Sequence, residues 1–146
     1  MAAAHRRQRR LSSRQHLRWQ HPGSTLSATC SGLKLKVRLY CIDTPEMQQR
    51  PWGTESGDYL RRITPRVVSL RIHDTDRYGR KVAEVIDPTS GTVLNRAMVE
   101  AGQAAVYQRY CPDPSDRQAE AGAKAARIGI WSQPGDHQRP RDWRNR

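Results

Sequence analysis

Residues 37–46 read Val-Arg-Leu-Tyr-Cys-Ile-Asp-Thr-Pro-Glu, and residues 75–80 read Thr-Asp-Arg-Tyr-Gly-Arg. The first stretch begins with the alternating residues of a strand and ends in a proline turn with a carboxylate on either side. The second is a polar loop between two strand-like segments, and its glycine permits a tight turn. Together they predict a β-rich middle part whose loops hold two carboxylates and two guanidinium groups.

The rest of the chain extends this pattern into short strands followed by helices. Strands are expected at 25–29, 33–42, 66–73 and 80–86, the first two joined by a turn at Ser31-Gly32. Helices are expected at 54–63, 93–101 and 114–128, which end at Pro65, Gly102 and Gly129. This order indicates the α+β class, and the small size with a basic surface favours a five-stranded barrel of the oligonucleotide-binding (OB) type.

Charge is distributed unevenly over the 146 residues, whose net charge is +12. Residues 1–42 carry nine basic groups and no acidic one, so the remaining residues hold 17 of the 26 basic groups against all 14 acidic ones. Such a field attracts polyanions, and nucleic acid is the expected partner. We expect a basic arm without regular structure over 1–18, a barrel domain over 19–132 and a polar tail over 133–146. The arm is equally compatible with a solvated charged segment.

Neither a membrane segment nor a secretory signal is visible. No apolar run approaches the roughly 20 residues of a spanning helix, and the start lacks the apolar stretch of a signal peptide. An Arg- and Ser-containing start without acids suits an organellar presequence or a misassigned start codon equally well, so localisation stays open. Three cysteines at unrelated spacings fit neither a disulfide framework nor a CxxC metal knuckle. We expect small core or surface residues, and a zinc site with His73 is the less favoured alternative.

The carboxylates and arginines of the two quoted stretches suit phosphodiester hydrolysis, which needs a metal ligand, a base for water and fixed positive charge. Read alone, Asp-Thr-Pro-Glu is also an ordinary turn with a polar rim. Spacing adds a condition, because in an ideal strand Arg38 and Asp43 point to opposite faces and lie roughly 17 Å apart. A bulge or a sharp coil must therefore lie between them.

The chain resembles the staphylococcal nuclease (thermonuclease) family from about Gly23 to Ser132, through residues 38–46, 76–80, 94–102 and 120–131. The resemblance implies a Greek-key OB barrel flanked by about three helices. It also implies a calcium-dependent endonuclease that acts on DNA and RNA and leaves 3′-phosphates. The apolar first strand of the family is replaced here by residues 16–21, so we expect that strand to be missing or irregular.

The resemblance also assigns roles to individual residues. It implies that Asp43 and the Thr44 carbonyl bind Ca²⁺, a hard cation that takes oxygen ligands. Glu46 matches the residue that orients or deprotonates the attacking water. Arginine suits the grip on phosphate because its planar fork makes two hydrogen bonds and keeps its proton. The matching positions are Arg38 and Arg80 for the scissile phosphate, Arg77 and Tyr78 beside it, and Tyr110 against a nucleotide base.

One departure bears on activity. The family has a second aspartate ligand where this chain has Ser24. Loss of a unit charge near a cation forfeits about 4 kcal/mol at roughly 4 Å with an effective dielectric near 20. Three hypotheses therefore remain: a metal-dependent phosphodiesterase weakened by this loss, a non-catalytic nucleic-acid-binding barrel, and a ribosome-associated structural protein. We expect a monomer, because no apolar helix face stands out.

Overall fold

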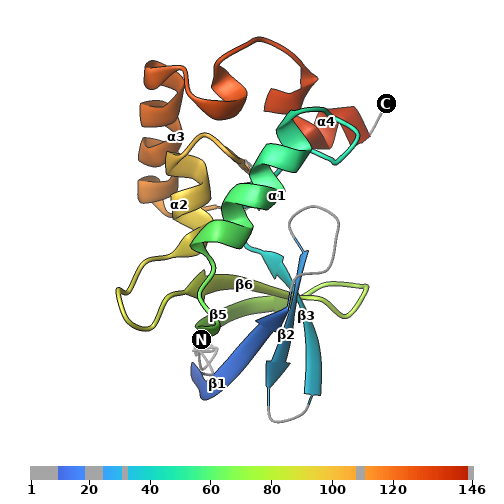
Figure 1. Ribbon diagram of the computed structural model, residues 1–146, viewed down its shortest axis with the longest axis vertical. Helices are drawn as coiled ribbons and strands as arrows, with labels where there is room; N and C mark the ends of the chain where they lie inside the picture. The colour runs from blue at the N-terminus through green and yellow to red at the C-terminus, as the bar shows by residue number, and fades with distance from the viewer. Residues whose placement is uncertain (1–9, 19–24, 31–32, 108–110, 145–146) are drawn as a thin grey trace, which may run out of the picture.

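The fold was analysed in a computed structural model, which describes residues 10–18, 25–30, 33–107 and 111–144. Strands gather at one end of the molecule and helices at the other (Figure 1). The strands are β1 (Arg10–Arg18), β2 (Thr25–Cys30), β3 (Leu33–Leu39), β4 (Ile42–Asp43), β5 (Val67–Thr75), β6 (Lys81–Ile86) and β7 (Ala105–Val106). The helices are α1 (Trp52–Ile63), α2 (Leu94–Glu100), α3 (Pro114–Ala126) and α4 (Pro140–Arg144), with 3₁₀ turns η1 (Gly129–Trp131) and η2 (Asp136–Gln138).

The main sheet is mixed. Its strands hydrogen-bond in the order β1-β2-β3-β6-β5, and β5 pairs again with β1. Only the β3–β6 pair is parallel within this ladder, and it sets Arg38 opposite Val82. A second, two-stranded sheet joins β4 to β7, with Asp43 opposite Ala105. The α+β class is confirmed, with four α-helices in the described residues where about three were expected.

The two ends of the chain hold more structure than the sequence indicated. β1 occupies Arg10–Arg18, within the segment expected to be an arm without regular structure, and it has an irregular register between Leu11 and Gln15. Its backbone pairs with both β2 and β5, and such long-range pairing leaves no local apolar pattern to read. The expected polar tail likewise contains η2 and α4. Residues 1–9 lie outside the described part of the chain.

The core fills the space between the sheet and the helices. It is built from fully buried aliphatic side chains of both layers, among them Leu26, Val37, Leu39, Val85, Leu60, Met98 and Val99. One buried amide ties the layers together, because the Asn95 side chain on α2 donates to the carbonyls of Tyr40 and Ala83 and accepts from the Val85 amide. A buried polar group with all these partners fixes how α2 sits on the sheet.

Two cysteines form a disulfide that the sequence analysis did not expect. Cys41, two residues after the end of β3, is bonded to Cys111, 70 residues later, and both are buried. Spacing gave no signal because the link joins segments that meet only in the folded chain. The expectation of separate small core residues is wrong for this pair. The side chain of Cys30 lies outside the described residues.

Candidate active site

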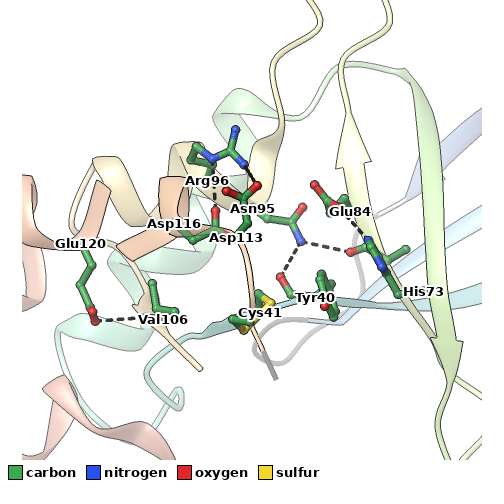
Figure 2. The surroundings of a disulfide bond; sticks show 12 residues. Tyr40, Cys41, His73, Glu84, Asn95, Arg96, Val106, Asp113, Asp116 and Glu120 are labelled. Atoms are coloured by element: carbon green, nitrogen blue, oxygen red, sulfur yellow. Dashed lines mark hydrogen bonds and ion pairs between the residues drawn. A yellow bond between two sulfur atoms is a disulfide. The ribbon is translucent and has the colours of Figure 1, made fainter. Parts of the chain in front are cut away.

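The predicted break between Arg38 and Asp43 is confirmed. β3 ends at Leu39, β4 begins at Ile42, and Cys41 between them has a φ of 66° in the left-handed region that side chains other than glycine seldom adopt. The disulfide (Figure 2) holds this turn, and so does a 2.8 Å hydrogen bond from the Tyr107 amide to the Cys41 carbonyl. The chain thereby changes sheets, and Asp43 need not point to the strand face opposite Arg38.

Asp43 and Glu46 converge on a single guanidinium group from the far end of the chain. Arg144 donates from Nη2 to Asp43 Oδ1 at 2.8 Å and from Nη1 to Glu46 Oε1 at 2.7 Å. The amide of Arg141 donates to Asp43 Oδ2 at 2.9 Å, so both oxygens of that carboxylate are engaged. Asp43 is only 7% exposed, and a buried carboxylate needs such partners.

The Arg144 guanidinium is held in its charged form. Its burial disfavours the charge, but hydrogen bonds to Glu46 and Asp43 and their negative charges outweigh that effect, and the pKa of Arg144 rises above its usual value. The side chain is still about one-third exposed, at 35%. The point where the two carboxylates meet is therefore a place that favours a cation.

Local packing fixes the loop that carries Glu46. The Glu46 amide donates to the Gln49 side chain at 2.9 Å, and the Gln49 amide donates back to the Glu46 carbonyl at 2.8 Å. Gly53, in the first turn of α1, packs so closely that an added Cβ would collide with the backbone of Glu46 and Met47. Thr44 in the same loop is buried at 5% exposure. The first turn of α1 thus fixes the position of the loop that carries Glu46.

The loop between β5 and β6 is organised around Asp76. Its carboxylate accepts from the amides of Tyr78 and Arg80, each at 2.9 Å, and from Arg80 Nε at 2.6 Å. Burial alone would raise the pKa of Asp76, but the hydrogen bonds from Arg80 and Tyr78 lower it overall. Arg77 and Arg80 both lie against the ring of Tyr78, which is exposed at 67%. This loop presents two guanidinium groups and an aromatic ring.

Arg38 and Asp43 line two cavities that share one aromatic wall. Arg38 and Asp76 border a cavity of about 220 Å³, and Asp43 and Arg141 border one of about 590 Å³. Tyr107 lines both, and its ring lies 5.8 Å from the Arg38 guanidinium and 5.4 Å from that of Arg141. Arg80 contacts Asp76, which borders the smaller cavity. Tyr107 thus lies between the cavity of Arg38 and the cavity of Asp43.

Several site residues were not foreseen, and others cannot be placed. Arg144, Arg141 and Asp76 contact predicted site residues, yet the sequence analysis did not select them. Arginines 141 and 144 stand in the tail that composition marked only as polar, although its density of arginines was visible. Tyr110 and Ser24 lie outside the described residues, so their predicted roles in base contact and in the missing metal ligand stay predictions.

The described residues offer a partial cation site. They contain no group of three His, Cys, Asp or Glu side chains arranged for a metal ion. They do bring two carboxylates to within the reach of one guanidinium, and oxygen donors beside a cation-favouring point suit a hard divalent ion. The donor set therefore fits calcium chemically, at the position that Arg144 holds.

In the described part of the chain, no helix combines the length and apolarity that crossing a membrane requires.

Known proteins are similar to this chain over the part that contains the predicted site residues. A family model, staphylococcal nuclease homologue, matches residues 36–133. An uncharacterized endonuclease of Escherichia coli O157:H7 is 34% identical over 125 residues, which cover 85% of this chain and 80% of that protein. A micrococcal nuclease of Shigella flexneri is 35% identical, with coverages of 84% and 75%. An uncharacterized endonuclease of Haemophilus influenzae is 36% identical, with coverages of 84% and 67%.

Proposed function

Because the chain belongs to the staphylococcal nuclease homologue family, we propose that it is a calcium-dependent endonuclease that hydrolyses phosphodiester bonds of DNA and RNA. The observation that carries this proposal is the convergence of Asp43 and Glu46 on one cationic group, with Tyr107 shared between the cavity of Asp43 and the cavity that Arg38 borders. We further propose that the β1-β2-β3-β6-β5 ladder is the Greek-key OB barrel of this family.

In this proposal Asp43 and the Thr44 carbonyl hold the calcium ion. When bound, the cation supplies positive charge to the phosphoryl oxygens and favours ionised water. Asp43 is suited to this task because it is fixed by β4 and shielded from bulk water, where its charge acts at a lower effective dielectric. The buried Thr44 follows it in the same rigid loop.

Glu46 acts as the general base. Its carboxylate takes a proton from water as the water oxygen bonds to phosphorus, and the bond from phosphorus to the 5′ oxygen breaks. The departing 5′ oxygen takes a proton from solvent water, Glu46 returns its proton to solvent, and a 3′-phosphate remains. Arg38 and Arg80 bind the phosphoryl oxygens, where charge accumulates in the transition state, and Arg77 with Tyr78 supports the neighbouring phosphate. We propose that Tyr110 contacts a base by stacking.

The test is release of acid-soluble nucleotides from single-stranded DNA and from RNA, with calcium and with a chelator. We expect cleavage that requires calcium and falls by about 10²- to 10⁴-fold in Glu46→Gln, the usual contribution of a general base. The control is Glu55→Gln, an exposed carboxylate in the first turn of α1. Cleavage that survives both the chelator and Glu46→Gln would remove the mechanism.

A second candidate is a nucleic-acid-binding barrel without turnover. It is favoured by the engagement of both carboxylates with Arg144 and by the lack of a three-ligand metal cluster among the described residues. In that case the protein would bind nucleic acid with an affinity that falls steeply with salt, without cleavage at millimolar calcium. Binding that ignores ionic strength would count against it.

A further inference from the structure

We propose that α4 is an autoinhibitory latch in which the Arg144 guanidinium takes the place of the divalent cation between Asp43 and Glu46. The inference rests on the proposed function, because it concerns access of the cation to the same two carboxylates. It goes beyond the family match, which ends at residue 133, before the segment that carries the latch.

The contact is specific to the two carboxylates that matter. Both terminal nitrogens of Arg144 are used, one on Asp43 and one on Glu46, which are three residues apart in sequence and nearly a hundred residues away from the arginine. The Arg141 amide closes the remaining oxygen of Asp43. A cation that binds between these two carboxylates would take the position of the Arg144 guanidinium, so the cation and the docked side chain exclude each other there.

The α4 latch also contacts the part of the site where we expect the substrate to bind. Arg141, one turn before Arg144, lies against the ring of Tyr107, on which Arg38 also rests. A docked α4 therefore covers the carboxylates and the aromatic wall between the two cavities. Removal of α4 would expose both at once, so the arrangement blocks cation and substrate together.

The segment before α4 provides an anchor and a bend. His137 is buried, stacks on Trp52 with ring centroids 4.1 Å apart, and its Nε2 lies 2.9 Å from the Ile130 carbonyl oxygen. Arg139 follows with a non-helical backbone, at φ −135° and ψ 70°. The contacts of His137 involve neither Asp43 nor Glu46. Residues after Arg139 can therefore swing away from the carboxylates while the His137 anchor stays in place.

Population arithmetic gives the expected size of the effect. Binding to a protein that is competent for only a fraction of the time is weakened by that fraction. If the latch is open in about one molecule in ten, loss of the latch tightens cation binding about tenfold. The divalent ion brings twice the charge of the guanidinium, so it displaces α4 at sufficient concentration.

The test is a calorimetric calcium titration of the full-length wild type, Arg144→Gln and Arg117→Gln. The Arg117 variant removes the same charge from an exposed position on α3 that borders neither cavity described above, so it controls for general electrostatics. We expect Arg144→Gln to bind calcium about tenfold more tightly than wild type, and Arg117→Gln to change affinity by less than about twofold. Equal affinity of the three proteins, equal gains in both variants, or no calcium binding by any of them would overturn the latch.

A second measurement uses the wild type and does not depend on a variant folding well. Hydrogen exchange of the Arg141 amide reports the docked state, because that amide donates to Asp43 Oδ2. Saturating calcium is expected to accelerate its exchange at least several-fold, while amides in α3 stay unchanged. Unchanged protection of Arg141 at saturating calcium would overturn the proposal.

Failure of the latch and failure of hydrolysis are distinguishable. A protein that gains calcium affinity in Arg144→Gln but cleaves no nucleic acid keeps the latch and loses the proposed activity. A protein that cleaves in a Glu46-dependent manner but whose calcium affinity ignores Arg144 keeps the activity and loses the latch.

Discussion

Two arginines in this molecule each bridge two carboxylates, and their surroundings differ. Arg96 on α2 reaches the start of α3, with Nη2 3.0 Å from Asp113 and Nε 3.1 Å from Asp116 (Figure 2). Arg144 on α4 reaches Asp43 and Glu46 at 2.8 and 2.7 Å. The first bridge joins two helices within the family match, and the second joins a helix beyond that match to the candidate site.

Asp113 and Asp116, the carboxylates that Arg96 bridges, have structural roles at the start of α3. Asp113 caps α3 by accepting from the Ser115 amide, and this bond, with help from Arg96, lowers the pKa of Asp113. The pKa of Asp116 is raised, chiefly by burial, although Arg96 opposes the rise. Asp43, at the end of β4, instead borders the larger cavity, and Glu46 lies in the loop that follows, where a soluble cation can compete for both. The Arg96 ion pairs thus act as a strut, meaning a fixed structural link between two helices. The Arg144 ion pairs are instead contacts that a cation can replace.

The largest expected difference concerns activity. Asp43→Asn removes the charge that we propose holds the cation, worth roughly 2–4 kcal/mol, and should lower the rate of single-stranded DNA hydrolysis about 30- to 700-fold. Asp113→Asn is the matched control, because asparagine caps a helix as well as aspartate does, and its activity should stay within about twofold of wild type. Equal activities of the two variants would break the distinction between strut and site.

A smaller difference concerns stability. Arg96→Gln leaves Asp116, whose side chain is only 12% exposed, without its cationic partner and should lower the free energy of unfolding by about 2 kcal/mol. Arg144→Gln should cost less than about 1 kcal/mol, because α4 can detach and let water reach Asp43. Urea unfolding measures both values. A larger loss in Arg144→Gln would mean that α4 is a strut and not a latch.

Sequence reasoning succeeded where the signal was local. The alternation of residues 67–72 and the glycines at 102 and 129 predicted β5 and the ends of α2 and α3, and the odd spacing of Arg38 and Asp43 predicted the turn that Cys41 makes. The family resemblance supplied the carboxylates and arginines and is confirmed.

Long-range contacts left no such signal. The Cys41–Cys111 bond spans 70 residues, and the contacts of Arg144 with Asp43 and Glu46 span 101 and 98. Polar composition in the tail is as typical of a solvated end as of a docked helix, so α4 could not be predicted. β1 was missed for a similar reason, because one of its two partners, β5, lies far along the chain.

The smallest expected effect concerns a third pair, Arg80 with Asp76, at 2.6 Å. Because the pKa of Asp76 is lowered in the fold, its ionised form stabilises the native state above its unfolded value near 3.8, and this contribution is lost as pH falls through the lower folded pKa. Asp76→Asn should therefore cost less than about 1 kcal/mol of unfolding free energy at pH 7, and the difference from wild type should shrink toward pH 3. Urea unfolding at both pH values measures this, with Asp58→Asn, an exposed position, as the baseline for loss of one negative charge. A stability difference between Asp76→Asn and wild type that grows on acidification would contradict the lowered pKa of Asp76. The carboxylate would then be better paired in the unfolded chain than in the loop that positions Arg80.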